Sequence, residues 1–200
     1  MKYFRIKESI DIKEIGNTYP QIQDAEYTCN TFEDENFIEN IGYKKIDFIP
    51  KLPIGKLHKK AKLTDFLSAA PDGYTRRLVI SNKLKNRLPD TGNYQLFSTK
   101  IKLNKNNRID YWLLNPINFY HENIDYNHTE FYLVESSFSK GEKLGHPYQL
   151  RMRKLKLNKN NGLDFIIINK ILGGVTYFVS DNLKKKIEKE GITGLVFEEI

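Results

Sequence analysis

The chain has 200 residues and a net charge of +7, and 40% of its residues are hydrophobic. This length suits one domain, and this hydrophobic content suffices for a packed core, which excludes a chain that is disordered throughout. The single cysteine, Cys29, excludes an intramolecular disulfide and is compatible with a reducing compartment. The sequence has neither a run of about 18 apolar residues nor the apolar core of a signal peptide. We therefore expect a cytoplasmic protein with no membrane contact.

The charge is unevenly distributed along the chain. Residues 1–48 have a net charge of −4, residues 49–118 of +10, residues 119–139 of −4 and residues 140–200 of +5, which sum to +7. The basic segment 51–108 makes a nucleic-acid-binding module the alternative function. Lysine supplies most of the positive charge, whereas forked contacts to phosphates and bases need arginine. A nucleic-acid partner is therefore the less favoured expectation.

The first part of the chain shows weak patterns. Residues 1–7 alternate apolar and charged side chains and predict a strand. Residues 8–48 contain short apolar clusters separated by glycine and proline, which predicts irregular structure with one or two short strands. We interpret residues 1–61 as an acidic, irregular extension of the domain that residues 62–200 form.

Clearer signals begin at Leu63. Residues 63–67 and 78–80 predict short strands, and Ser81 is a suitable N-cap for a helix that carries Leu84 and Leu88. The last quarter repeats this arrangement. Tyr177-Phe178-Val179 predicts a buried strand that leads into the closing helix.

The closing helix has signals at both ends. Ser180 is the expected N-cap, and Leu183 and Ile187 lie on one face. Gly191 is the expected left-handed residue of a Schellman turn, in which Ile192 packs back on Ile187. Residues 195–197 then predict a final strand, so that the unit reads strand, helix, strand.

Two segments of similar sequence predict hairpins. Residues 102–115 read KLNKNNRIDYWLLN and residues 156–169 read KLNKNNGLDFIIIN. We expect residues 94–103 to pair with 109–114, and residues 148–157 to pair with 163–168. The paired asparagines, Asn106-Asn107 and Asn160-Asn161, suit left-handed turn positions. Either a duplication or two uses of one hairpin chemistry explains the similarity. Strands outnumber helices, so the predicted class is α+β, with one mainly antiparallel sheet and two short helices that follow strands.

Motifs for catalysis are missing from the sequence. It has no P-loop, no GxGxxG, no GxSxG and no cysteine–histidine arrangement. His121 and His128, with Glu122, Asp125 and Glu130 nearby, form the one cluster that could hold a metal, but their spacing is not that of the HExxH helix. We therefore expect no enzyme activity, no metal and no cofactor.

Several segments together resemble a family of bacterial immunity proteins from polymorphic-toxin systems. They are KLTDFL at 62–67, LVISNKLKNRL at 78–88, the strand at 94–97, YWLLNP at 111–116 with Ile124-Asp125, FVSDNLKKKI at 178–187 and GITGLVFEEI at 191–200. The resemblance covers about two thirds of the chain, and residues 1–61 have no counterpart. It implies a small α+β cytoplasmic protein that neutralises a cognate toxin by direct binding, without catalytic residues.

The segment 119–130 is the expected partner-binding region. It carries the densest acidic and aromatic cluster of the chain: Tyr120, Glu122, Asp125, Tyr126 and Glu130. Such side chains, held on loops by an ordered scaffold, contribute strongly to binding. The other interpretation is that the acidic residues solvate a loop while Tyr120 or Tyr126 lies in the core.

Overall fold

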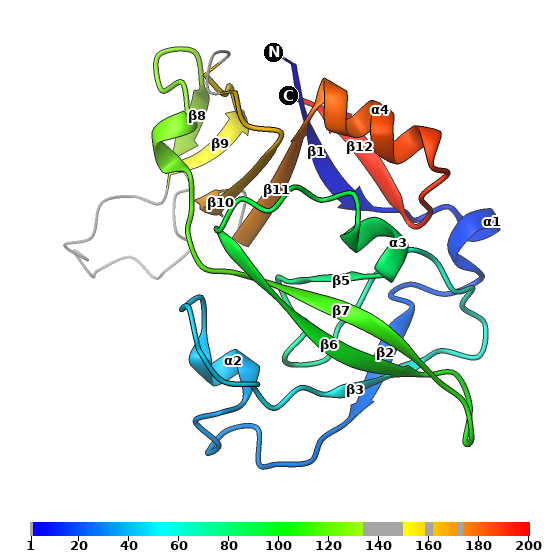
Figure 1. Ribbon diagram of the computed structural model, residues 1–200. Helices are drawn as coiled ribbons and strands as arrows, with labels where there is room; N and C mark the ends of the chain where they lie inside the picture. Colours follow the sequence, from blue (N-terminus) through cyan, green and yellow to red (C-terminus); the bar gives the residue numbers. More distant parts are fainter. Residues whose placement is uncertain (1, 134–149, 159–161, 172–173) are drawn as a thin grey trace, which may run out of the picture.

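The computed structural model describes residues 2–133, 150–158, 162–171 and 174–200 (Figure 1). The protein is an α+β fold rich in strands, as the sequence predicts. Its strands are β1 (Tyr3–Glu8), β2 (Ile22–Glu26), β3 (Ile54–Leu57), β4 (Phe66–Leu67), β5 (Leu78–Ile80), β6 (Tyr94–Lys102), β7 (Arg108–Pro116), β8 (Glu130–Leu133), β9 (Leu150–Lys154), β10 (Phe165–Ile171), β11 (Gly174–Ser180) and β12 (Leu195–Glu199). Its helices are α1 (Ile12–Ile15), α2 (Ile38–Ile41), α3 (Asn82–Lys85), a 3-10 turn at His121–Asn123, and α4 (Asp181–Lys189).

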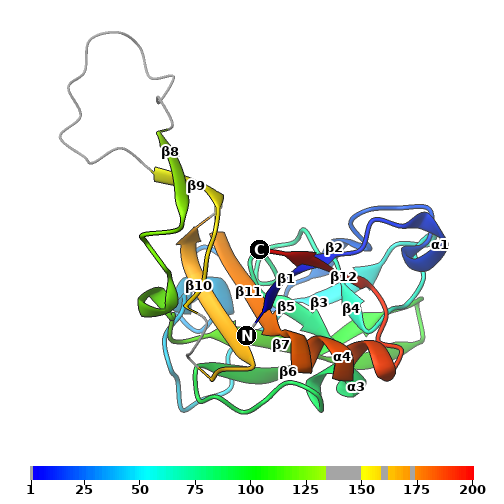
Figure 2. The same ribbon diagram turned by 90° about the horizontal axis from the view of Figure 1, so that it is seen from above.

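The strands are divided between two main sheets, which corrects the expectation of one sheet. The first has the order β10-β11-β1-β12, and the second has the order β2-β3-β6-β7-β5-β4. Strands β8 and β9 form a separate two-stranded sheet that stands apart from the main body (Figure 2). All pairs are antiparallel except β3 with β6. A shared core of apolar side chains joins the two main sheets, with contributions from β1, β5, β7, β10, β11, α3 and α4.

Residues 1–61 take part in both sheets. Strand β1 lies between β11 and β12, and the β2–β3 pair joins the second sheet through β6. Acidic side chains of this region form ion pairs with the basic middle of the chain. These pairs are Asp24–Lys56, Glu26–Lys102, Asp34–Lys51 and Glu39–Arg77. The opposite charges of the two regions therefore meet within the fold.

The closing unit is built as the sequence predicts. The Ser180 hydroxyl accepts a hydrogen bond from Leu183 N (3.1 Å), and Leu183 and Ile187 are buried. Gly191 has φ +62°, and Gly191 N and Ile192 N donate to the carbonyls of Glu188 and Ile187. These two bonds define the predicted Schellman turn.

Helices α3 and α4 begin with the same arrangement. Asp65 immediately precedes β4. Ser81 N donates to its carbonyl oxygen, and Ser81 Oγ donates to its carboxylate. Ser180 N and Oγ donate in the same way to Asp164, which immediately precedes β10. Each capping serine is therefore oriented by the aspartate that precedes the neighbouring strand. The sequences around Ser81 and Ser180 are similar, and so are the structures of the two helix starts. Asp65 and Asp164 lie outside these similar segments.

Replacing Ser180 with alanine is expected to lower the free energy of unfolding by about 1–2 kcal/mol, the usual cost of a lost N-cap. Ser81→Ala is a parallel test with a similar expected cost, because it removes the same cap from the four-residue helix α3. Urea unfolding of both variants checks the expectation. Two variants as stable as the wild type would show that these hydroxyls do not stabilise the helices.

The second predicted hairpin is wrong. Strand β9 pairs with β8, and β10 pairs with β11. Four consecutive residues of β10, Phe165–Ile168, are fully buried, so this strand lies inside the protein with an apolar neighbour on β11. The first hairpin, β6 with β7, is confirmed over nine residue pairs.

The turn of the first hairpin differs from the prediction. Among the described non-glycine residues only Arg76 has a positive φ, so neither Asn106 nor Asn107 is left-handed. Instead, Asn104 Oδ1 accepts hydrogen bonds from the backbone N of both residues at 3.0 Å. A side-chain turn of this kind replaces the left-handed backbone. Asn160-Asn161 lies outside the described residues.

Candidate functional site

The predicted partner-binding region lies between β7 and β8 and is held by backbone hydrogen bonds. Tyr120 N donates to the carbonyl of Ile167 on β10 at 2.9 Å. Asp125 N donates to the carbonyl of Lys156 at 2.9 Å, and Asn158 N donates to the carbonyl of Asn123 at 2.8 Å. The buried Ile124 anchors the centre of the segment in a second apolar cluster. The region is therefore an ordered loop fixed at several points.

Tyr120 and Asp125 support this loop from within. The Tyr120 ring is partly buried against the second apolar cluster, and Asn93 Nδ2 donates to its hydroxyl. Asp125 accepts hydrogen bonds from His128 N (3.2 Å) and His128 Nδ1 (2.8 Å). The hydrogen bond from His128 lowers the pKa of the Asp125 carboxyl, so Asp125 is ionised at neutral pH. These two side chains shape the loop.

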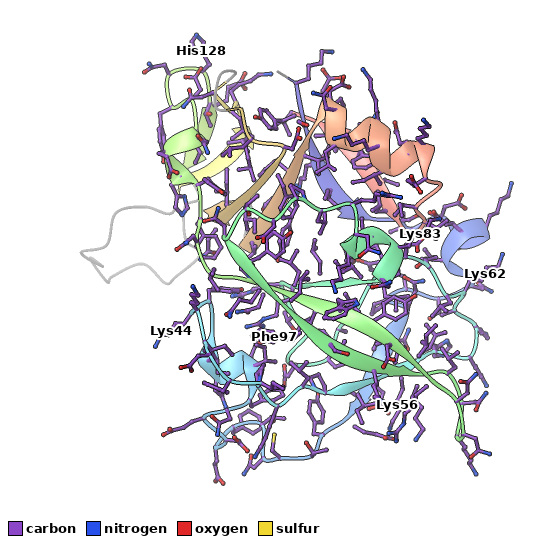
Figure 3. All side chains as sticks on the ribbon, in the orientation of Figure 1. Lys44, Lys56, Lys62, Lys83, Phe97 and His128 are labelled. Atoms are coloured by element: carbon purple, nitrogen blue, oxygen red, sulfur yellow. The ribbon has the colours of Figure 1, made fainter. Side chains whose placement is uncertain are left out.

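Glu122, Tyr126 and Glu130 lie on its surface. All three are exposed, and 58% of Tyr126 is accessible to solvent. His128 projects at the same end of the molecule (Figure 3). The structure thus divides the five predicted residues into two that order the loop and three that it presents to solvent.

The histidines of this region do not converge on a metal site. Within the described parts of the chain, no three histidine, cysteine or acidic side chains form a group that could hold a metal ion. His128 is bonded to Asp125, and the His121 ring lies 6.3 Å from the Phe119 ring. The contacts of both residues are local.

Much of the positive charge of the basic segment 51–108 is paired with carboxylates. Figure 3 shows Lys62 and Lys83 on the right side of the view and Lys56 near the bottom. Many cations of this segment are paired with carboxylates: Lys51, Lys56, Arg77, Lys83, Arg87, Lys100, Lys102 and Arg108. Binding of a nucleic acid would require a continuous cationic surface.

The structure also exposes an apolar and acidic surface near α2, which the sequence analysis did not select. Phe32 is 88% exposed and Ile49 is 89% exposed, and Glu33 and Glu35 are exposed beside α2. The two apolar residues belong to segments joined by the Lys51–Asp34 ion pair. Their lack of a periodic pattern explains why the sequence did not mark them. We call this group, with Phe48, the α2 surface.

Comparisons with known proteins add no relative: the sequence matches no protein-family model and no curated protein. In the described residues, no helix is both long and apolar enough to span a membrane.

Proposed function

We propose that the protein is an immunity protein, which binds a toxin encoded beside it and blocks the toxin's activity. The observation that carries this proposal is the ordered loop at 119–130, which presents Glu122, Tyr126 and Glu130 to solvent. The resemblance of residues 62–200 to immunity proteins gives the expected partner class.

The loop is already ordered in a shape that can bind a partner. Backbone hydrogen bonds to Ile167 and Lys156 hold the loop in place before any partner arrives, so little conformational entropy is lost on association. A tyrosine offers a large contact area, and two carboxylates attract a basic partner such as a nuclease domain. We therefore expect a partner with a cationic surface.

The test is binding to the toxin domain encoded next to this gene. The variant Glu122→Lys/Tyr126→Ala/Glu130→Lys is expected to bind about 10- to 100-fold more weakly, through loss of the aromatic contact and reversal of two charges. Asp125 is left unchanged because its carboxylate orders the loop. Wild-type association should also slow as the salt concentration rises.

The matched control is Glu188→Lys/Glu190→Lys on the exposed side of α4, which makes the same change in net charge elsewhere. It should bind and protect cells like the wild type.

A loop variant that folds and protects equally well would exclude the loop as the interface, and Phe32→Ala/Ile49→Ala would then test the α2 surface. A wild-type protein that does not bind the neighbouring toxin would overturn the proposed function. If the wild-type protein instead bound nucleic acid with an affinity that falls with salt, the alternative function, a nucleic-acid-binding module, would be favoured.

A further inference from the structure

Strands β1 and β11 pair at one end only. Their ladder comprises Tyr3↔Ser180, Phe4↔Val179 and Arg5↔Phe178, and beyond it the described residues of the two strands form no further pair. Figure 1 shows the two strands diverging from this point like the arms of a V. Each strand continues for several residues, and each remains paired on its other side, β1 with β12 and β11 with β10.

The backbone groups of the diverging arms face the gap. The amide and carbonyl of one residue in a strand point to the same side, and those of the next residue point to the other. Lys2 O accepts from Asp181 N across the paired end, so even-numbered residues of β1 point towards β11. Ser180 N donates to Asp164 O beside β10, so odd-numbered residues of β11 point towards β1. Two strand edges with hydrogen-bonding groups therefore face each other across the V.

A cleft of about 480 Å³ occupies this place. Its walls include Ile6 and Glu8 of β1 and Val175 and Tyr177 of β11, the residues whose backbone groups face the gap. Phe66, Leu78 and Tyr74 also line it. Its size lies in the range of ligand-binding pockets, and its lining combines apolar surface with polar groups.

Among the described residues, four cations and one carboxylate line the cleft, and three of the cations form ion pairs within the protein. Arg5, Lys7 and Arg76 line it, whereas Glu8 is its acidic lining residue. Arg5 and Lys7 share the carboxylate of Glu198 at 3.8 and 2.7 Å. The buried Arg77 also borders the cleft but is paired with Glu39. Tyr19 donates a hydrogen bond to Glu8, and burial raises the pKa of that carboxyl.

Arg76 adds a second sign of a binding site. It has φ +63°, a conformation that glycine adopts without strain and arginine does not. Its carbonyl accepts a hydrogen bond from the Tyr177 hydroxyl at 2.9 Å, and its exposed side chain passes over Gly174 at the start of β11. Strained residues of this kind concentrate at functional sites, where the side chain has a use.

We propose that this cleft binds an extended, acidic peptide segment of a partner protein. The segment enters at the wide end of the V between β1 and β11, beside Glu8 and Val175. There it pairs as an additional strand with the backbone groups that face the gap. Strand neighbours lie about 4.8 Å apart, so insertion stops where the β1–β11 ladder begins. A carboxylate on the segment pairs with Arg76. This proposal is independent of the toxin contact proposed for the loop at 119–130.

The probe is a fluorescently labelled peptide of about eight residues with alternating valine and glutamate. Its central residues are expected to pair in the cleft, because only three residues of β1 and four of β11 continue beyond the ladder. We expect it to bind the full-length protein at least about 10-fold more tightly than the same peptide with lysine in place of glutamate. Methylation of alternate backbone nitrogens of the peptide, those that would donate to the strand of the protein, should weaken binding by a similar factor. The methyl groups remove the hydrogen bonds between the peptide and that strand. Fluorescence anisotropy measures each dissociation constant.

Two variants locate the binding. Arg76→Gly suits φ +63° and is expected to remain folded while it binds the glutamate peptide about 5- to 10-fold more weakly. Val175→Trp fills the cleft and should abolish binding. Lys105→Gly, at the exposed tip of the β6–β7 hairpin, is the control and should bind like the wild type. Wild-type protein that ignores the glutamate peptide overturns the proposal, as does binding that neither cleft variant changes. Binding that survives backbone methylation but needs Arg76 would also overturn it, in favour of a site for small anions. None of these outcomes bears on toxin binding.

Discussion

Gly194→Ala is expected to lower the free energy of unfolding by about 3–5 kcal/mol. A Cβ at this position would lie 2.1 Å from the Phe66 carbonyl oxygen and 2.5 Å from Thr64 Oγ1, and φ is +86°. Gly194 also joins two distant segments, since its carbonyl accepts from Ser9 N and its amide donates to Glu14. The added methyl group must therefore displace backbone, which a packed protein resists.

Gly191→Ala is the control for this prediction. Gly191 has a similar φ, +62°, but a Cβ there would meet nothing within 4 Å. Only the backbone conformation opposes the change, at a cost of about 1–2 kcal/mol. Urea unfolding of the two variants separates the steric effect from the conformational one. Equal losses of stability would show that Phe66 and Thr64 do not pack closely enough against Gly194 to oppose a Cβ.

Arg77→Met is expected to destabilise the protein by about 3–5 kcal/mol, because it removes one partner of a buried ionic network. The Arg77 side chain is 1% exposed and bonds to Glu39 Oε2 (2.5 Å) and Asn115 Oδ1 (2.9 Å). It also donates to the carbonyls of Ile38 and Gly42 at the two ends of α2. Methionine fills a similar volume but satisfies none of these acceptors.

Two further variants test whether the forked guanidinium is what matters. Arg77→Lys should recover only part of the stability, because a single ammonium cannot reach acceptors on both β7 and α2. Glu39→Gln should cost only about 1 kcal/mol, since the glutamine keeps an oxygen that can accept from Arg77, and the other acceptors of the guanidinium remain in place. Thermal and urea unfolding provide the measurements. A full rescue by lysine would show that the charge alone stabilises this region.

Local signals in the sequence predicted the elements whose ends are chemically marked. Ser81 and Ser180 cap their helices, and Gly191 ends α4, because capping depends on residues a few positions apart. The β6–β7 hairpin was predictable for the same reason, since its two strands are joined by a short connection. Its turn was not, because Asn104 supplies a side-chain acceptor that makes left-handed asparagines unnecessary.

Strand pairing over longer distances was not predictable. Segments 102–115 and 156–169 have similar sequences, yet β10 pairs with β11 rather than with the strand before it. A strand that is apolar on both faces matches any apolar neighbour, so its own pattern does not select one. The division into two sheets follows from such choices.

The candidate site shows the same limit. The sequence located an acidic and aromatic cluster at 119–130, but it could not tell that Tyr120 faces the core and Tyr126 faces solvent. That difference arises from contacts with β10, more than 40 positions away. The α2 surface was missed because exposure has no sequence pattern in an irregular segment.

By itself, then, the sequence determined the α+β class, the two capped helices and the first hairpin, all of which depend on neighbouring residues. Only the tertiary structure decided that acidic residues of the N-terminal region form ion pairs with the basic middle, as in the Glu26–Lys102 pair. It also decided that β1 enters between β11 and β12 and leaves an open cleft beside β11. The physical reason is that these features join residues up to nearly 200 positions apart, such as Phe4 and Glu199, whose meeting depends on the packing of the whole chain.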